Sequence, residues 1–243
     1  MIPSEKIKYI SNWIKDYVDQ MPNKAQSLVI GISGGIDSSV SSTLSAMTGL
    51  RTIVLAMPIK QKENQHDLSL KHQEWLIKNF KNVEAHTINL DKLFDSFSST
   101  LNKFDNEHGF ANSRARLRMA TLYQVAAANK GIVVGTGNKV EDYGIGFYTK
   151  YGDGGVDIAP IADLYKSEVW ELGEYLDVDQ RIVDAKPTDG LWDDGRNDED
   201  QIGATYVELE KAMENKTGVA LNILEEYNKK NKHKMEPIPT FKL

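Results

Sequence analysis

Hydrophobic positions along the chain alternate between two patterns. Short runs rich in β-branched residues, typical of buried parallel strands, occupy residues 27–33, 51–57, 83–90 and 131–136. Stretches with apolar residues at helical spacing lie between these runs, at residues 38–48, 67–80 and 113–129. The alternation of strand and helix predicts an α/β fold, a doubly wound parallel sheet flanked by helices on both faces.

Both ends of the chain are also predicted to contain a helix. Near the N-terminus, Ile7, Ile10, Ile14 and Val18 follow one another at spacings of three and four. This spacing predicts an amphipathic helix over residues 4–18 that packs on the sheet or on another subunit. A lysine-rich helix is expected before the C-terminal tail.

Two segments differ in composition from the rest of the chain. Residues 141–157 are rich in glycine, and residues 189–200 contain six acidic side chains. Such segments bury little apolar surface, so they are expected to be loops. They are either solvated surface loops or lids that close over an active site.

Composition narrows the class of protein. With 243 residues, of which 40% are hydrophobic, the chain is expected to form a single domain over residues 1–243. The net charge is −6 and the basic residues are spread out, which argues against a nucleic-acid-binding protein. No apolar run is long enough to span a bilayer, and the first residues lack the apolar stretch of a signal peptide. We therefore expect a cytoplasmic protein with no membrane partner.

A glycine-rich and serine-rich segment, residues 31–39, lies between the first predicted strand and the following predicted helix. Glycines let the backbone approach an anion, the helix start presents unpaired N–H groups, and Ser33 and Ser38 add hydroxyl donors. The segment has neither the Walker lysine nor the GxGxxG spacing. It predicts a phosphate site, and a carboxylate beside phosphates, Asp37, implies a bridging Mg²⁺ ion.

This loop resembles the SGGxDS loop of the N-type ATP pyrophosphatases, which have the adenine nucleotide alpha hydrolase-like fold and cleave ATP to AMP and pyrophosphate. The resemblance implies that the loop binds ATP through Gly31, Ile32, Ser33, Gly34, Gly35, Ile36, Asp37 and Ser38. The loop alone leaves several reactions open, among them those of GMP, asparagine and argininosuccinate synthetases and of tRNA-thiolating enzymes. A non-catalytic nucleotide-binding regulator is the alternative from another class.

Further motifs resemble NAD synthetase, over residues 30–234. They are VGTGNKVE at residues 134–141, FYTKYGDGGVD at 147–157, Lys166, and KPT at 186–188. The resemblance implies a ligase that adenylates the nicotinate carboxylate of deamido-NAD with ATP, releases pyrophosphate, and amidates the adenylate with ammonia to give NAD and AMP. It also implies a homodimer in which deamido-NAD lies across the subunit interface.

The same resemblance assigns roles to individual residues. It implies ATP contacts for Thr136, Lys166 and Thr188 and Mg²⁺ coordination by Asp37 and Glu141. It implies deamido-NAD contacts for Arg116, Lys150, Asp157, His233 and Lys234. Without the resemblance, Glu141, Lys166 and His233 would be interpreted as ordinary solvated side chains. Arg114, on the same predicted helix as Arg116, is expected to be a surface arginine.

Two catalytic groups are predicted. Lys166 is expected to stabilise charge on the phosphoryl oxygens. Asp153 is expected to bind ammonium and take its proton, because it lies between two residues assigned to the acid substrate. The chain has no cysteine, which excludes a thiol glutaminase within it and favours free ammonia as the nitrogen donor.

The sequence departs from many family members in two places. Gly137 stands where many members have aspartate, and the spacing from Glu141 to Lys150 is one residue longer.

Overall fold

A four-stranded parallel sheet forms the centre of the computed structural model, which describes residues 1–61, 63–188 and 197–242. Its strands are β1 (Ser27–Gly31), β2 (Thr52–Ala56), β3 (Val83–Thr87) and β4 (Gly131–Val133). They are ordered β3-β2-β1-β4, and Val29 of β1 lies between Ile53 of β2 and Val133 of β4. The predicted parallel sheet is confirmed.

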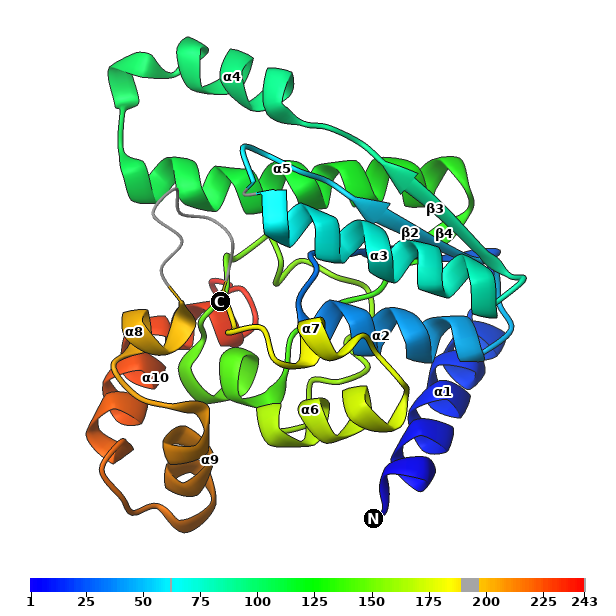
Figure 1. Ribbon diagram of the computed structural model, residues 1–243. Helices are drawn as coiled ribbons and strands as arrows, with labels where there is room; N and C mark the ends of the chain where they lie inside the picture. Colours follow the sequence, from blue (N-terminus) through cyan, green and yellow to red (C-terminus); the bar gives the residue numbers. More distant parts are fainter. Residues whose placement is uncertain (62, 189–196, 243) are drawn as a thin grey trace.

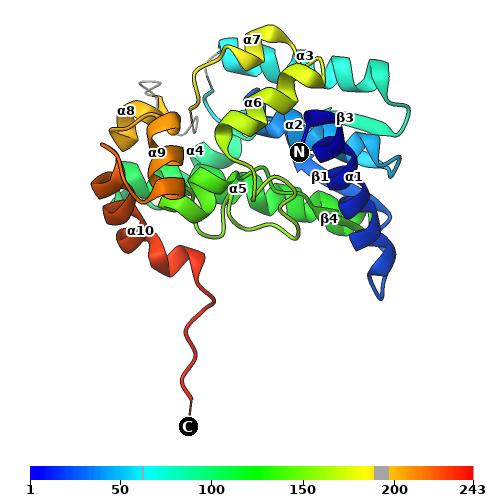
Figure 2. The ribbon, with the colours of Figure 1, turned by 90° about the horizontal axis from the view of Figure 1, so that it is seen from below.

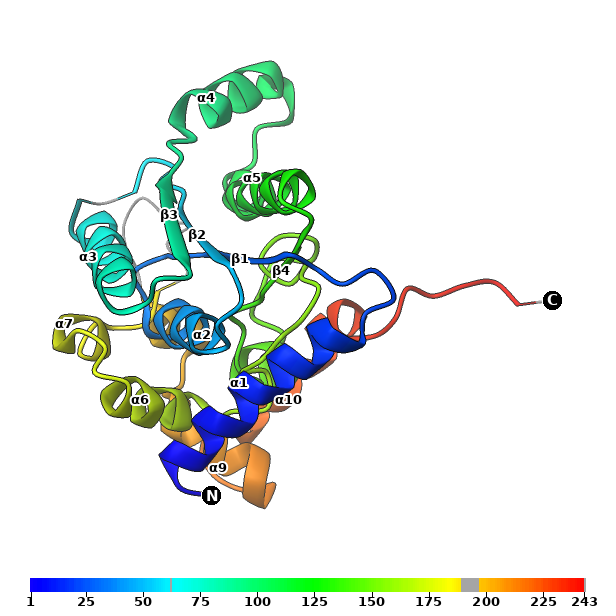
Figure 3. The same cartoon turned by 90° about the vertical axis from the view of Figure 1, so that its right-hand side faces the viewer.

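Helices cover both faces of the sheet, as predicted: α2 and α3 lie on one face and α5 on the other (Figure 3). The described helices are α1 (Pro3–Gln20), α2 (Ile36–Met47), α3 (Glu63–Asn79), α4 (Asp91–Thr100), η1 (Asn102–Phe104), α5 (Glu107–Ala128), η2 (Val140–Ile145), α6 (Lys166–Tyr175), α7 (Gln180–Val183), α8 (Asp198–Ile202), α9 (Tyr206–Asn215) and α10 (Leu221–Met235). None of them is long and apolar enough to cross a membrane.

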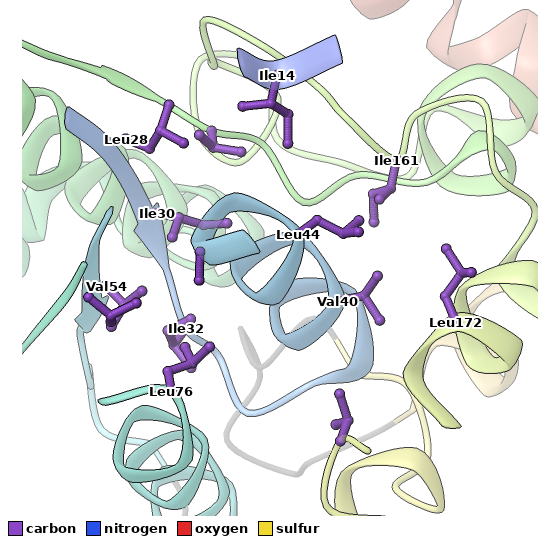
Figure 4. Packing of buried hydrophobic residues seen from close by; sticks show 14 of the residues in the cluster. Ile14, Leu28, Ile30, Ile32, Val40, Leu44, Val54, Leu76, Ile161 and Leu172 are labelled. Carbon is purple, nitrogen blue, oxygen red and sulfur yellow. The ribbon is translucent and has the colours of Figure 1, made fainter. Parts of the chain in front are cut away.

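The largest hydrophobic cluster lies between the sheet and the layer formed by α1, α2, α3 and α6. Figure 4 shows Ile30 of β1, Leu44 of α2 and Leu172 of α6 within it. A second cluster packs α5 against the opposite face of the sheet. Apolar burial on both faces is the main stabilising contribution in a sheet of this kind, so these two layers hold the sheet in place.

A third hydrophobic cluster lies beside the sheet, among η2 and helices α8, α9 and α10, which lie together at one end of the molecule (Figures 1 and 2). We call it the helical cluster; it is built from Val140, Ile145, Ile202, Ala204, Tyr206, Leu209, Ala212, Ala220 and Leu224. Beyond α10 the chain extends away from this end (Figure 2).

Several expectations about individual elements were wrong. Strand β3 is at the edge of the sheet, and Glu84, His86 and Thr87 are exposed rather than buried. Helix α1, by contrast, is the expected amphipathic helix: it packs on α2 and α6, and its buried face joins the hydrophobic cluster that includes Leu28 and Ile30 of β1. The two expected loops are partly helical, since η2 covers residues 140–145 and α8 includes residues 198–200; residues 189–196 lie outside the described part of the chain.

The order of the strands determines where a ligand can bind. After β1 the chain builds the sheet outward through β2 and β3, and β4 then joins the other side of β1. The connection from β1 to β2 runs through α2 on one face, and the connection from β3 to β4 runs through α5 on the other. The strand order therefore reverses between β1 and β4, which is the position where open α/β sheets bind ligands at the carboxyl ends of their strands. The loops that follow β1 and β4 meet there.

Candidate functional site

The loop after β1 turns sharply into α2. Gly34 has φ of 90°, a conformation that glycine adopts without a steric penalty, and Gly35 is the N-cap of α2. The hydroxyl groups of Ser33 and Ser38 lie 3.0 Å apart, and Ser38 donates to the carbonyl of Gly35 at 3.0 Å. The start of α2 therefore presents its N–H groups within a loop that its own serines hold in shape, an arrangement suited to an anion.

Three charged side chains from three different elements meet beside this loop. Lys166 Nζ lies 2.5 Å from Asp37 Oδ2 and 3.0 Å from Glu141 Oε1. The lysine side chain is 2% exposed, while those of Asp37 and Glu141 are 18% and 17% exposed. The structure thus brings together three residues that the sequence assigned separately to ATP and Mg²⁺.

Close packing of α6 on α2 positions Lys166, which is the first residue of α6. A Cβ atom at Gly173 of α6 would overlap with the Ile36 side chain of α2, so glycine permits this approach. At the N-terminus of α6, the Glu168 carboxylate accepts the backbone N–H of Tyr165 at 2.9 Å. Lys166 consequently extends over the start of α2, toward Asp37.

Two residues that the sequence analysis did not select hold the carboxylates. Asn138 is fully buried; it donates to Asp37 Oδ1 at 3.2 Å and accepts the N–H groups of Val140 and Glu141, each at 3.1 Å. Tyr206 of α9 is also fully buried and donates to Glu141 Oε1 at 2.7 Å. Asn138 lies within the VGTGNKVE motif at residues 134–141, but the segment that follows it was expected to be a loop, so its bonds to the N–H groups of Val140 and Glu141 were not predicted. Tyr206 lies in no motif.

The charges of this group depend on one another. Burial raises the pKa of Asp37, opposed by Lys166. For Glu141, burial acts in the same direction, but the attraction of Lys166 and the bond from Tyr206 outweigh it and lower the pKa. Burial would lower the pKa of Lys166, yet the two carboxylates outweigh it and the pKa is raised. The lysine is therefore held in its charged form.

The carboxylates of Asp37 and Glu141 fit a Mg²⁺ ion. Both already face one cation, the ammonium group of Lys166, and carboxylate oxygens are the protein ligands that Mg²⁺ prefers. Within residues 1–61, 63–188 and 197–242, no group of three or more His, Cys, Asp or Glu side chains is arranged to hold a metal. The protein would thus supply two ligands, and phosphate and water the others.

The two sequence departures meet in one place. The six-residue π-helix η2 is the kind of local widening that accommodates an additional residue in a helix, and it lies within the lengthened spacing. From η2, the carboxylate of Asp142 lies against Gly137, where a Cβ atom would overlap with it. Burial and the nearby Glu141, Asp153 and Asp37 raise the pKa of Asp142 to about 8.

Helix α10 holds η2 and the loop after it through side chains on one helical face. Asn228 donates to the carbonyl of Gly144 at 3.0 Å, and Asn231 donates to that of Ile145 at 2.8 Å. One turn further on, Lys234 Nζ donates to the carbonyl of Tyr148 at 2.8 Å. The first two bonds satisfy carbonyls at the end of η2, and the third satisfies one in the loop that follows it.

Most residues assigned to the acid substrate lie around this loop. Lys150 Nζ donates to the carbonyl of His233 at 2.8 Å, and Arg116 Nε donates to the carbonyl of Lys150 at 3.3 Å. With Lys234, these residues join α5, the 147–151 segment and the end of α10 into one basic group. Burial lowers the pKa of Lys234.

Asp157 and Asp153 have other surroundings. Asp157 lies beside the end of β4, where its carboxylate accepts the hydroxyl of Tyr123 at 3.0 Å and the N–H of Val133 at 2.7 Å. Asp153 is exposed and accepts the N–H of Thr149 at 3.0 Å.

The two assigned threonines and Arg114 complete the predicted set. Thr136 lies just beyond β4, and Thr188 is the last described residue before the gap at 189–196; both are half-buried. Arg114 was expected at the surface, and this was wrong. It is buried, with its guanidinium group 4.9 Å from the ring centroid of Phe94, because that face of α5 is covered by α4.

The parallel sheet, the phosphate loop at its switch point and the helices on both faces define the fold of the N-type ATP pyrophosphatases. The NAD synthase family model matches residues 6–238. The NH(3)-dependent NAD(+) synthetase of Carboxydothermus hydrogenoformans is 34% identical over 238 residues, which cover 95% of this chain and 94% of that protein. The chain therefore belongs to the NAD synthase family and is an enzyme.

Two solved structures resemble the chain over the whole length of both proteins. The NMN synthetase from Francisella tularensis has a TM-score of 0.92 and 36% identity, with 100% of each chain covered. The NH3-dependent NAD synthetase from Campylobacter jejuni subsp. jejuni has a TM-score of 0.79 and 25% identity, again with 100% of each chain covered.

Proposed function

We propose that the protein uses ATP to adenylate the nicotinate carboxylate of deamido-NAD and then amidates it with ammonia, giving NAD, AMP and pyrophosphate. The observation that carries the proposal is the group formed by Asp37, Glu141 and Lys166 beside the phosphate loop. It combines a cation for phosphoryl oxygens with two metal-binding carboxylates, at the edge of the sheet where nucleotides bind.

In the first step the carboxylate of the acid attacks the α-phosphorus of ATP, and the bond to pyrophosphate breaks. Negative charge develops on the phosphoryl oxygens. Lys166 and the N–H groups at the start of α2 are placed to stabilise it, and preorganised donors of this kind contribute about 3 kcal/mol each. Asp37 and Glu141 would hold Mg²⁺, which neutralises phosphate charge when bound.

In the second step ammonia attacks the carbonyl carbon of the acyl-adenylate and AMP leaves. Ammonium must lose a proton before its nitrogen can attack. We assign this proton transfer to Asp153, whose carboxylate is exposed beside the basic group. Because the chain has no cysteine, it has no thiolate with which to release ammonia from glutamine.

The basic group of Arg116, Lys150, His233 and Lys234 is suited to the phosphates of the acid substrate. With Asp157, these residues form the proposed binding site for deamido-NAD. We propose a homodimer in which the substrate lies across the interface, so that a second copy of the chain completes each site.

A second candidate acid is the mononucleotide, with NMN as the product. The backbone agrees better with the Francisella NMN synthetase, at a TM-score of 0.92, than with the Campylobacter NAD synthetase, at 0.79. Both acids present the same nicotinate carboxylate to Asp37, Glu141 and Lys166, which we call the activating group. The two acids differ in one part of the molecule: deamido-NAD carries an adenylate half, and nicotinate mononucleotide lacks it.

The test is a reaction of purified protein with ATP, MgCl₂ and ammonium chloride, with deamido-NAD or nicotinate mononucleotide as the acid. Pyrophosphate release should require an acid, chromatography should show NAD or NMN, and glutamine should not replace ammonium. Asp37→Asn and Glu141→Gln should abolish turnover, whereas Asp95→Asn on the exposed part of α4 should not. Nucleotide binding without any pyrophosphate release would instead indicate a regulator.

A further inference from the structure

Tyr206 contacts two members of the charged group at once. Its hydroxyl donates to Glu141 Oε1 at 2.7 Å, and the Lys166 ammonium lies 4.9 Å from the centroid of its ring. The next carboxylate, that of Asp198, is 3.4 Å from the hydroxyl. A phenol has one proton to donate, so the shorter bond to Glu141 is the one that it makes.

The ring of Tyr206 is fixed on all sides. Its exposure is 0%, and the ring meets Trp170 edge-on at 6.1 Å between centroids. Trp170 lies one helical turn after Lys166 on α6, so Tyr206 packs on the face of α6 that carries the lysine. The backbone is held too, since the N–H of Tyr206 donates to Glu199 at 2.9 Å and Thr205 caps α9.

From these contacts we infer that Tyr206 is a positioning residue for the activating group: its hydroxyl orients the Glu141 carboxylate and its ring face holds the Lys166 ammonium, so that both meet Asp37 at the start of α2. The inference rests on the proposed function, because it gives Glu141 the task of binding the metal that accompanies ATP. Hydrogen bonds to a ligating carboxylate fix its orientation, and their loss typically weakens metal binding 10-fold to 100-fold.

The experiment compares two variants that each remove one hydroxyl, one from Tyr206 in the helical cluster and one from Tyr227 of α10, which packs against this cluster. Tyr206→Phe keeps the ring against Lys166 and Trp170 but loses the bond to Glu141. Tyr227→Phe is the matched control, because the Tyr227 hydroxyl donates to the carbonyl of Gln201 at 3.0 Å and, among the residues that the structure describes, contacts no carboxylate. Binding of Mn²⁺, as a spectroscopic substitute for Mg²⁺, is followed by electron paramagnetic resonance in the presence of α,β-methylene-ATP.

We expect Tyr206→Phe to bind Mn²⁺ about 10-fold more weakly than the wild type, and Tyr227→Phe to bind it with unchanged affinity. In turnover, the Mg²⁺ concentration that gives half the maximal rate should rise in Tyr206→Phe. The KM for the acid should stay constant, since the residues assigned to the acid lie elsewhere. A general loosening of the fold would raise both the Mg²⁺ requirement and the KM for the acid.

Equal Mn²⁺ affinity in the wild type and Tyr206→Phe would overturn the inference, as would an equal loss in both variants. The binding measurement involves no turnover. It therefore decides the role of Tyr206 even if the wild type made neither NAD nor NMN, an outcome that would refute the proposed function instead.

Discussion

Replacing Lys166 with methionine should destabilise the protein strongly, because the lysine lies between two carboxylates that would then face each other. Removing one partner of a buried ion pair costs about 3–5 kcal/mol. The Asp37 and Glu141 side chains keep 18% and 17% exposure, which lets water screen part of their repulsion. We therefore expect the free energy of unfolding to fall by about 3 kcal/mol, at the lower end of that range.

The measurement is urea unfolding followed by circular dichroism, with calorimetry as a second method. For a chain of this size, a loss of about 3 kcal/mol lowers the Tm by roughly 6–12 °C. The double variant Asp37→Asn/Lys166→Met should regain part of the loss, because it removes one of the two facing charges.

Lys6 provides a matched control. Its ammonium also bridges two carboxylates, at 2.8 Å from Glu168 and 3.3 Å from Glu171, but these carboxylates are solvated, with side chains 30% and 51% exposed. Exposed pairs contribute about 0–1 kcal/mol, so Lys6→Met should have a small effect. If Lys166→Met destabilised the protein no more than Lys6→Met, the assigned burial and charge balance of the group would be refuted.

Three further predictions concern other buried contacts. Burial lowers the pKa of His72 to about 4, so the unfolded chain takes up a proton at a higher pH than the folded chain does. The free energy of unfolding should therefore fall by up to about 3 kcal/mol as the pH drops from 6.5 to 4. His72→Gln should lack this loss in urea titrations at both pH values. Gly137→Ala should lower the Tm, because the added Cβ atom overlaps with the Asp142 carboxylate, and adding Asp142→Ala should restore part of the loss. Additive changes in Tm in the double variant would contradict this overlap. Asn138→Ala should cost about 1–3 kcal/mol in urea unfolding, and an unchanged midpoint would contradict its bridging role.

Sequence patterns predicted the central part of the fold because the strands there are buried on both faces. The runs at β1, β2 and β4 match the structure closely, and the alternation with helices gave the correct layers. The same pattern did not show that β3 is at the edge, since a hydrophobic run does not record how many neighbours a strand has. Helix α4 was missed, although Leu93, Phe94 and Phe97 stand at helical spacing within it.

For the site, the sequence led to three charged residues that the structure brings together, but not to the residues that support them. The phosphate loop gave Asp37, and family resemblance gave Glu141 and Lys166, but no pattern indicated that one lysine would contact both carboxylates. Tyr206 is far from every motif in the sequence, and an aromatic residue at the start of a helix is ordinarily part of a core. Tertiary packing, rather than any local preference, brings it to Glu141.

The helical cluster joins the two ends of the proposed reaction. Through Tyr206 it contacts Glu141 and Lys166, at the ATP end. Through the side chains of α10 it holds the loop that carries Lys150, at the acid end. Because η2 lies between these contacts, a shift of α10 would move Glu141 and the acid-binding loop together. The positions of these two regions therefore depend on the same helix.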